Sequence, residues 1–197
     1  MKVIGIVGGM GAGKSTVITI MNEMQPLSYI SADLIGHEIL KKDEAAYQPI
    51  VEAFGKEILD NSGEIVRQKL GQVVFGSTEK VTLLNAITHP IITTKIKERI
   101  AYYQKTAPSQ HIILEAALLL ESGLVDLTDV VIAVYANKDV RLKRVMARES
   151  LDEKHILKRF KAQKEWEEIK VVADYVIDNG ISLESTTTQI KQLLTLL

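Results

Sequence analysis

The 197-residue sequence contains no cysteine, which excludes disulfide bonds and thiolate metal sites. Aromatic residues make up only 5% of the chain, and the formal net charge is only −1. A chain so close to neutral has no general electrostatic attraction for nucleic acid or for an anionic membrane. We therefore expect no nucleic acid and no membrane among its partners, and a reducing, cytoplasmic location.

Long hydrophobic runs are also missing. The longest, Ile112–Leu120, is interrupted by Glu115 and is too short to cross a bilayer. The apolar run Val3–Val7 is too short for the core of a secretory signal and leads to Lys14 instead of a cleavage site. The sequence thus predicts one domain over 1–197, acting as a monomer or a weak homo-oligomer.

The clearest motif present is G-x-x-x-x-G-K-S, at Gly8–Ser15 and directly after Val3–Val7. This is the phosphate-binding P-loop, whose glycines let backbone N–H groups approach phosphate oxygens. An apolar-periodic helix follows, and its positive N-terminal end points toward the same anion. We predict that ATP is bound by Gly11, Ala12, Gly13, Lys14, Ser15 and Thr16.

Within this motif the side chains have separate predicted roles. Lys14 reaches the β- and γ-phosphates and is a catalytic residue, Ser15 offers its hydroxyl to Mg²⁺, and Thr16 contacts the α-phosphate. The four histidines of the sequence show no metal-ligand spacing. Any metal is therefore expected to be the Mg²⁺ that accompanies ATP.

Five apolar runs alternate with amphipathic helical patterns along the chain. Near-continuous apolar strands of this kind predict an α/β fold, in which helices cover both faces of a five-stranded parallel sheet. Ligands of such sheets bind beyond the carboxyl ends of the strands. The predicted strands are Val3–Val7, Ser28–Ser31, His111–Glu115, Val130–Tyr135 and Tyr175–Ile177.

The stretch 34–104 has no strand pattern and is too long for one crossover helix. We interpret it as an inserted helical subdomain that binds the acceptor substrate. Its last helix is expected to run from about Glu79 to Tyr103, interrupted at His89-Pro90 because proline cannot continue a helix undisturbed.

The charge-rich region 138–166 follows the fourth strand. Arg141, Arg144 and Arg148 share one helical face, and Ser150–Glu153 predicts a capping box at the start of a second helix. A solvated helical pair would show the same pattern. Beside a P-loop, however, two such helices are typical of a lid that closes over ATP and stabilises the transferring phosphoryl group.

Acidic residues end two of the predicted strands. Asp33 follows the second strand, where it can cap the next helix, serve as the catalytic base near the acceptor hydroxyl, or do both. Glu115 ends the third strand, where P-loop proteins place a carboxylate that holds Mg²⁺; the alternative is a solvent-facing charge. Arg67 and His89 are weaker candidates for binding an acidic acceptor.

Taken together, these residues resemble the dephospho-coenzyme A kinase family over nearly the whole chain. The resemblance implies transfer of the ATP γ-phosphate to the ribose 3′-hydroxyl of dephospho-coenzyme A, the last step of coenzyme A synthesis. It also implies that Asp33 is the base, that 34–104 binds the acceptor, and that Arg144 and Arg148 act from the lid. The matching segments are G-I-V-G-G-M-G-A-G-K-S-T at 5–16, A-D-L-I at 32–35, G-E-I-V-R-Q-K-L-G-Q-V-V-F at 63–75, H-P at 89–90, L-L-L-E-S-G-L at 118–124, R-V-M-A-R at 144–148 and A-D-Y-V-I-D-N at 173–179.

Several positions depart from the family pattern, and the stretch Glu115–Glu121 also lacks the proline of the usual Pro-Leu-Leu-Phe-Glu. Glu115 stands where the family usually has Asp, Arg141 stands in place of a Gln, and Val66 replaces the Asp that precedes Arg67. The P-loop, Asp33 and the lid arginines keep the family's residues.

Two other functions remain open. A different small-molecule kinase, such as a nucleoside monophosphate kinase, would use the same chemistry with another acceptor. A regulatory GTPase is a weaker match, because Asn137-Lys138-Asp139 imitates the guanine-binding Asn-Lys-x-Asp but Val140 occupies its fourth position.

Overall fold

The computed structural model describes residues 1–149, 152–161 and 163–197. The chain divides into two compact units, one made of residues 1–30 and 103–197 and the other of residues 31–102. Within the described ranges, every helix is too short or too polar to cross a membrane.

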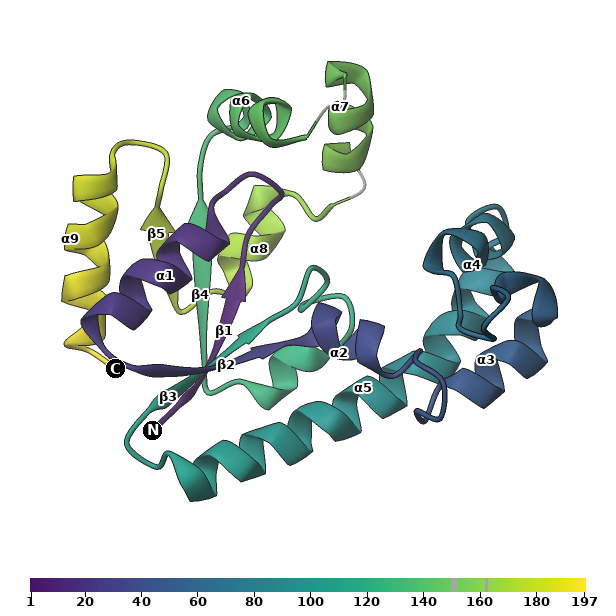
Figure 1. Ribbon diagram of the computed structural model, residues 1–197. Helices are drawn as coiled ribbons and strands as arrows, with labels where there is room; N and C mark the ends of the chain where they lie inside the picture. Colours follow the sequence, from purple (N-terminus) through teal and green to yellow (C-terminus); the bar gives the residue numbers. More distant parts are fainter. Residues whose placement is uncertain (150–151, 162) are drawn as a thin grey trace. The chain divides into compact units, whose positions relative to one another are not determined.

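A five-stranded sheet with the strand order β2-β3-β1-β4-β5 lies at the centre of the first unit (Figure 1). The central strand β1 pairs in parallel with β3 and β4, and β4 pairs in parallel with β5. The predicted α/β fold is confirmed, and two strand ends differ by one residue from prediction. The bounds are β1 (Val3–Val7), β2 (Leu27–Ser31), β3 (His111–Glu115), β4 (Val130–Tyr135) and β5 (Tyr175–Asp178).

Helical segments connect the successive strands of this unit, as parallel pairing requires. Helix α1 lies beside α9 in Figure 1. A short 3₁₀ turn, η2 (Leu124–Leu127), precedes β4. The helices are α1 (Lys14–Met24), α6 (Lys138–Arg148), α7 (Glu153–Lys161), α8 (Trp166–Val172) and α9 (Leu183–Leu194).

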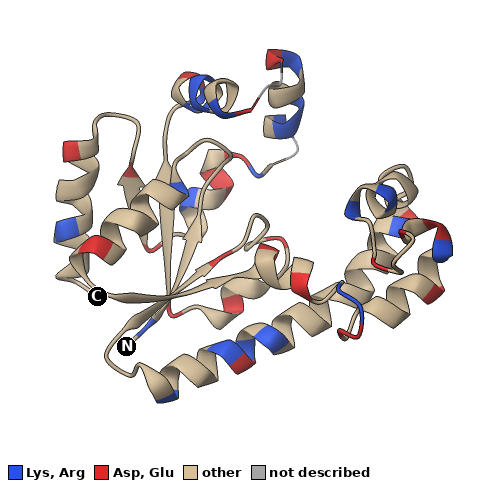
Figure 2. Cartoon of the chain, viewed as in Figure 1, with Lys and Arg blue, Asp and Glu red and all other residues tan. Residues whose placement is uncertain are grey.

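Helices α6 and α7 carry a concentration of lysine and arginine, which Figure 2 shows in blue. The carboxylate of Asp152 accepts a hydrogen bond from the His155 N–H at 2.8 Å and thereby caps the first turn of α7. The capping box predicted at Ser150–Glu153 includes residues 150 and 151, which lie outside the described residues.

The second unit contains α2 (Ala32–Glu38), α3 (Tyr47–Phe54), the 3₁₀ turn η1 (Lys56–Ile58), α4 (Arg67–Val74) and most of α5 (Thr78–Thr106). The predicted interruption at Pro90 is wrong, because α5 is one helix of 29 residues that continues through this proline. Proline removes only one backbone N–H donor, and the helical turns before and after it keep their backbone hydrogen bonds. The hydroxyls of Thr88 and Thr94 add bonds of 2.9 Å to the carbonyls of Leu84 and Pro90.

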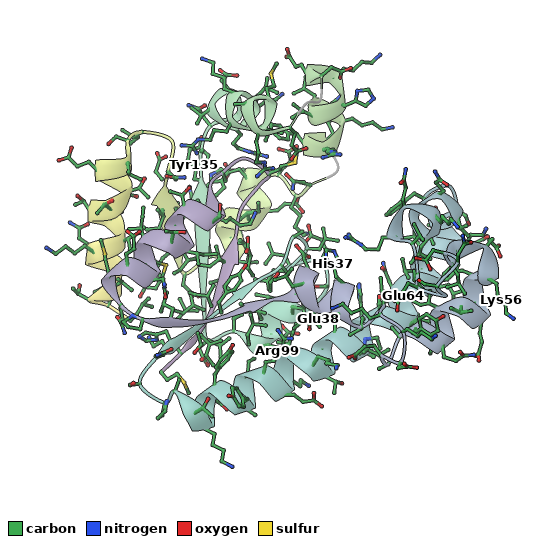
Figure 3. All side chains as sticks on the ribbon, viewed as in Figure 1. His37, Glu38, Lys56, Glu64, Arg99 and Tyr135 are labelled. Carbon is green, nitrogen blue, oxygen red and sulfur yellow. The ribbon has the colours of Figure 1, made fainter. Side chains whose placement is uncertain are left out.

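Ion pairs connect α5 with the start of the second unit. Arg99 donates to Glu38 on α2 at 2.5 Å, and Lys95 donates to Glu44 at 3.0 Å. Figure 3 shows Arg99 and Glu38 as neighbours, with His37 next to Glu38 on the same helix. These partly exposed pairs each contribute about 1 kcal/mol or less to stability, so they define how the elements dock more than they drive folding.

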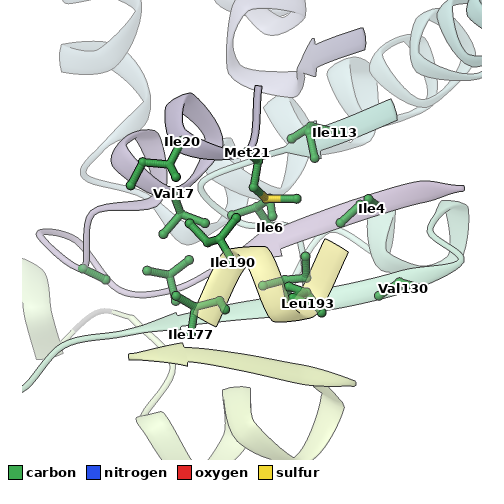
Figure 4. Packing of buried hydrophobic residues seen from close by; sticks show 13 residues of the cluster. Ile4, Ile6, Val17, Ile20, Met21, Ile113, Val130, Ile177, Ile190 and Leu193 are labelled. Atoms are coloured by element: carbon green, nitrogen blue, oxygen red, sulfur yellow. The ribbon is translucent and has the colours of Figure 1, made fainter. Parts of the chain in front are cut away.

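The core of the first unit lies between the sheet and the helices α1 and α9 (Figure 4). Ile4 and Ile6 on β1, Val17 on α1 and Ile190 on α9 all have 0% exposure. Burying one such side chain contributes about 1.5–3 kcal/mol, so this layer fixes the strand that leads into the P-loop. The opposite face of the sheet receives α8, whose Ile169 is buried.

Candidate active site

The P-loop forms the turn between β1 and α1. Gly13 occupies the N-cap position of α1 with φ 92°, a left-handed conformation that favours glycine. No side chain caps this helix end, so the backbone N–H groups of its first turn remain available to an anion. The Lys14 ammonium donates to the Gly8 carbonyl at 3.0 Å and thereby lies over the loop.

Several carbonyl groups of the loop are held from outside by side chains. Arg144 on α6 donates to the carbonyls of Gly11 and Ala12, at 3.5 and 3.2 Å, and to the carbonyl of Asn179 at 2.7 Å. The Asn179 amide also donates to the Ala12 carbonyl, at 2.8 Å. These bonds fix the directions of the Gly11 and Ala12 carbonyls.

A pocket of about 490 Å³ opens beside the P-loop, within the usual size range of small-molecule sites. All of its lining residues belong to the first unit. Most of the residues predicted to bind the nucleotide or the metal ion therefore line the same pocket. The lining includes Gly11, Gly13, Lys14, Ser15, Thr16, Glu115, Arg144, Arg148 and Gln163.

Glu115 is half-buried at the end of β3 and faces this pocket together with Ser15. Tyr29 on β2 donates its phenol proton to the Glu115 carboxylate, and the two oxygens lie 2.5 Å apart. The hydroxyl of Ser15 and this carboxylate form an oxygen donor set of the kind that suits Mg²⁺. Tyr29 was not among the predicted residues, since sequence alone does not show which side chains meet across neighbouring strands.

Arg148, at the end of α6, lines the same pocket and donates to Glu149 at 2.7 Å. Arg159 on α7 donates to the other oxygen of Glu149, at 2.8 Å. The hydrogen bond from Arg148 and the charges of both arginines lower the pKa of the Glu149 carboxyl below its ordinary value. One carboxylate therefore connects the two charge-rich helices.

Arg141 connects α6 with both the P-loop and α7. Its Nε donates to the Met10 carbonyl at 2.9 Å, and its guanidinium carbon lies 4.3 Å from the centre of the Phe160 ring. The Gln163 side-chain oxygen accepts a hydrogen bond from the Met10 N–H at 2.9 Å. Both backbone polar groups of Met10, its N–H and its carbonyl, therefore have side-chain partners. Burial lowers the pKa of Arg141, while Glu165 and Tyr135 act in the opposite direction.

The GTPase alternative depended on Asn137, and the structure gives this residue another use. Its side-chain oxygen accepts the Val140 N–H at 2.9 Å and caps the N-terminus of α6. An N-cap role explains an asparagine at this position without a guanine base.

In the second unit, Asp33 lies exposed in the first turn of α2. The capping alternative for Asp33 is wrong, because Ser31 is the N-cap residue and accepts the Leu34 N–H at 3.3 Å. His37 lies one turn further along the helix. Burial and the charge of Arg67 lower the pKa of His37, and the charge of Asp33 raises it. Asp33, His37 and Arg67 thus share one electrostatic environment.

Arg67 is the exposed first residue of α4, whereas His89 is half-buried in the middle of α5. Among the described residues, no interaction joins the His89 ring to Asp33 or Arg67. The described parts of the chain also contain no cluster of three His, Asp or Glu side chains arranged to bind a metal ion.

Comparison with known proteins identifies close relatives along nearly the whole sequence. The family model of dephospho-CoA kinase matches residues 2–185. The dephospho-CoA kinase of Carboxydothermus hydrogenoformans is 40% identical over 194 residues, covering 98% of this chain and 93% of that protein.

Solved structures agree with the sequence relatives. The Thermus thermophilus protein TT1252 has a TM-score of 0.81 at 27% identity, covering 99% of this chain and 97% of that one. A dephospho-CoA kinase from Campylobacter jejuni has a TM-score of 0.65 at 29% identity, covering 98% of this chain and 95% of that one.

Proposed function

This chain belongs to the dephospho-CoA kinase family, and from that premise we propose that it transfers the γ-phosphate of ATP to the ribose 3′-hydroxyl of dephospho-coenzyme A. The products are coenzyme A and ADP, and the reaction is the final step of coenzyme A biosynthesis. The observation that carries the proposal is the pocket in which the P-loop, a strand-end carboxylate and two arginines of α6 meet, within a chain that matches this family from residue 2 to 185.

ATP is the phosphoryl donor in this proposal, and the P-loop holds its phosphates. The N–H groups of the first turn of α1 bind phosphate oxygens, and Lys14 neutralises the charge of the β- and γ-phosphates. Arg144 and Arg148 approach the same phosphates from α6. Support comes from the uncapped helix end and from all three cationic side chains lining the same pocket.

Ser15 and Glu115 are the proposed protein ligands of Mg²⁺, held directly or through water. When bound, the ion neutralises charge that develops on the phosphate oxygens. Glu115 reaches further than the aspartate usual in the family, and the bond from Tyr29 limits where its carboxylate can lie. Tyr29 thereby orients the proposed metal ligand.

Asp33 is the proposed general base, and it accepts the proton of the 3′-hydroxyl as the phosphoryl group leaves ATP. Its exposed carboxylate, and the charge of Arg67 acting on the same His37 that Asp33 acts on, support an acceptor site in the region 34–104. Arg67 suits the anionic groups of the acceptor because its guanidinium can bind phosphate through two donors. His89 remains the least supported member of this acceptor site.

The function is tested by measuring ADP release from Mg-ATP with dephospho-coenzyme A, AMP, CMP or no acceptor. We expect strong stimulation by dephospho-coenzyme A alone. Stimulation by AMP or CMP would indicate a nucleoside monophosphate kinase instead, and preferential binding of GTP over ATP would indicate a GTPase. A cytoplasmic location and a monomeric or weakly associated state stay predictions, the latter testable by light scattering.

A further inference from the structure

Asn179 follows β5 and is almost completely buried, with 5% exposure. Its side-chain amide donates to the carbonyl of Ala12 at 2.8 Å, joining two parts of the chain that are 167 positions apart. A carbonyl oxygen can only accept a hydrogen bond, so the nitrogen of the amide must face Ala12. The amide oxygen of Asn179 must then face the opposite way.

Thr186 on α9 supplies the donor that this oxygen needs. Its hydroxyl lies 3.0 Å from the Asn179 amide oxygen, and the Thr186 residue has 0% exposure. Among the described residues, no buried side-chain nitrogen or oxygen lacks a partner, although the single proton of the Thr186 hydroxyl is shared between the Asn179 amide oxygen and the Ser182 carbonyl, which also lies 3.0 Å away. By donating to the amide oxygen, the hydroxyl of Thr186 holds the Asn179 amide in this orientation.

The orientation matters because of the geometry of a trans peptide, in which the C=O and the following N–H point in opposite directions. Holding the Ala12 carbonyl toward Asn179 directs the Gly13 N–H away from it. Gly11 and Gly13 flank Ala12 with φ values of 82° and 92°, and glycine leaves the backbone unusually free to rotate. An external anchor is therefore required to keep this peptide in one orientation.

Arg144 also donates to the Ala12 carbonyl, but from α6, where its guanidinium is proposed to contact the phosphates of ATP. Asn179 directly follows β5, and although Arg144 also donates to its backbone carbonyl, the bond from its side-chain amide to Ala12 does not involve α6. If Arg144 turns toward the nucleotide, the bond from Asn179 continues to hold the peptide.

We propose that Asn179, oriented by Thr186, is a positioning residue for ATP binding: it fixes the Ala12–Gly13 peptide so that the Gly13 N–H faces the phosphates. The inference rests on the proposed binding of ATP by the P-loop. It assigns a role to the A-D-Y-V-I-D-N segment at 173–179, and it makes the start of α9 part of the nucleotide site.

The test is a comparison of two neighbouring threonines in the full-length protein. Thr186→Val removes the hydroxyl and keeps the side-chain shape. Thr187→Val is the matched control. The hydroxyls of Thr186 and Thr187 each lie within hydrogen-bonding distance of the carbonyl four residues earlier on the helix, but only the Thr186 hydroxyl also reaches Asn179. Thr186→Ser keeps the hydroxyl and should restore the wild-type behaviour.

The dissociation constant of ATP is measured by calorimetry, with the two KM values and the melting temperature as further readouts. Loss of one buried hydrogen bond predicts that Thr186→Val weakens ATP binding by about 3- to 10-fold. The KM for dephospho-coenzyme A should not change, and Thr187→Val and Thr186→Ser should bind ATP within about twofold of wild type, because neither loses the bond to Asn179.

A lowered melting temperature with unchanged ATP affinity would show that Thr186 is merely structural and would overturn the proposal. Equal effects of Thr186→Val and Thr187→Val on ATP binding would do the same. If Thr186→Val does not fold, Asn179→Asp decides, since it places an acceptor against the Ala12 carbonyl and should weaken ATP binding roughly tenfold or more. A wild-type protein that binds ATP but phosphorylates no acceptor would refute the proposed function and leave this comparison valid.

Discussion

Replacing Arg141 with the glutamine that is usual in the family should destabilise the first unit. The guanidinium makes a hydrogen bond of 2.9 Å to the Met10 carbonyl and lies 4.3 Å from the centre of the Phe160 ring. A charged hydrogen bond contributes about 1.5–3 kcal/mol and a cation–π contact about 0.5–2 kcal/mol. Burial of the cation opposes both, as the lowered pKa of Arg141 indicates. A net loss of about 1–2 kcal/mol on Arg141→Gln is therefore expected.

Trp166 provides the assay, because it is the only tryptophan of the chain and its ring centre lies 4.6 Å from that of Tyr135 in the same unit. Urea unfolding followed by its fluorescence gives the free energy of unfolding for wild type, Arg141→Gln and the control Lys143→Gln, an exposed position on the same helix. The variant Phe160→Leu completes a double-mutant cycle with Arg141→Gln, in which we expect a coupling of about 0.5–1 kcal/mol. If Arg141→Gln were no worse than Lys143→Gln, or the coupling were zero, our account of how α6, α7 and the P-loop are connected would be refuted.

Three further predictions concern single residues. Lys14→Ala should lower turnover by about a hundredfold or more, because the charge on the β- and γ-phosphates is no longer neutralised; steady-state ADP release measures this, and near-normal turnover would contradict the assignment. Asp33→Asn should lower kcat about a hundredfold or more while ATP binding stays normal, as expected for loss of a general base; an unchanged kcat, or a loss of ATP affinity instead, would show that Asp33 has another role. Burial, aided by the charges of the N-terminal amine and of Lys2, lowers the pKa of His111 below its ordinary value, and its Nδ1 accepts the Lys2 backbone N–H at 3.1 Å. The stability that neutral His111 contributes is therefore complete above the pKa that this histidine has in the unfolded chain, and it is lost as the pH falls through its pKa in the folded protein. His111→Gln should then reduce the difference between the free energies of unfolding measured at about pH 7.5 and about pH 5.5. An unchanged difference would contradict this.

The sheet and the P-loop were predictable because their signals are local. Runs of β-branched residues mark the buried parallel strands, and three of the five predicted strands have the bounds found in the structure. The Gly8–Ser15 motif determines both the turn and the helix end that follows it. These features depend on neighbouring residues, which a single sequence displays directly.

Pro90 shows where local rules fail. A proline inside a helix has a penalty of about 3 kcal/mol, and the sequence alone therefore favours a break. In the structure α5 continues through Pro90, since the hydrogen bonds of its other turns and the burial of Ile96 outweigh one lost donor. Tertiary packing of this kind cannot be weighed from sequence.

Contacts between distant segments were also beyond prediction. The sequence indicates that Asn179 ends a strand, but the bond to Ala12 depends on how β5 and the P-loop are placed in the folded sheet. The same holds for Tyr29, which meets Glu115 only because β2 and β3 are neighbours. Residue types were visible in the sequence, and their partners were not.

The central claim, that this protein phosphorylates the 3′-hydroxyl of dephospho-coenzyme A, is tested most directly by identifying the product. The wild-type protein and Lys14→Ala are incubated with Mg-ATP and dephospho-coenzyme A, and the products are separated and analysed by mass and by phosphorus NMR. We predict one phosphorylated product with the spectrum of authentic coenzyme A, formed by the wild type and about a hundredfold or more slowly by Lys14→Ala. Release of ADP without a phosphorylated acceptor, or a phosphate at any other position, would contradict the account.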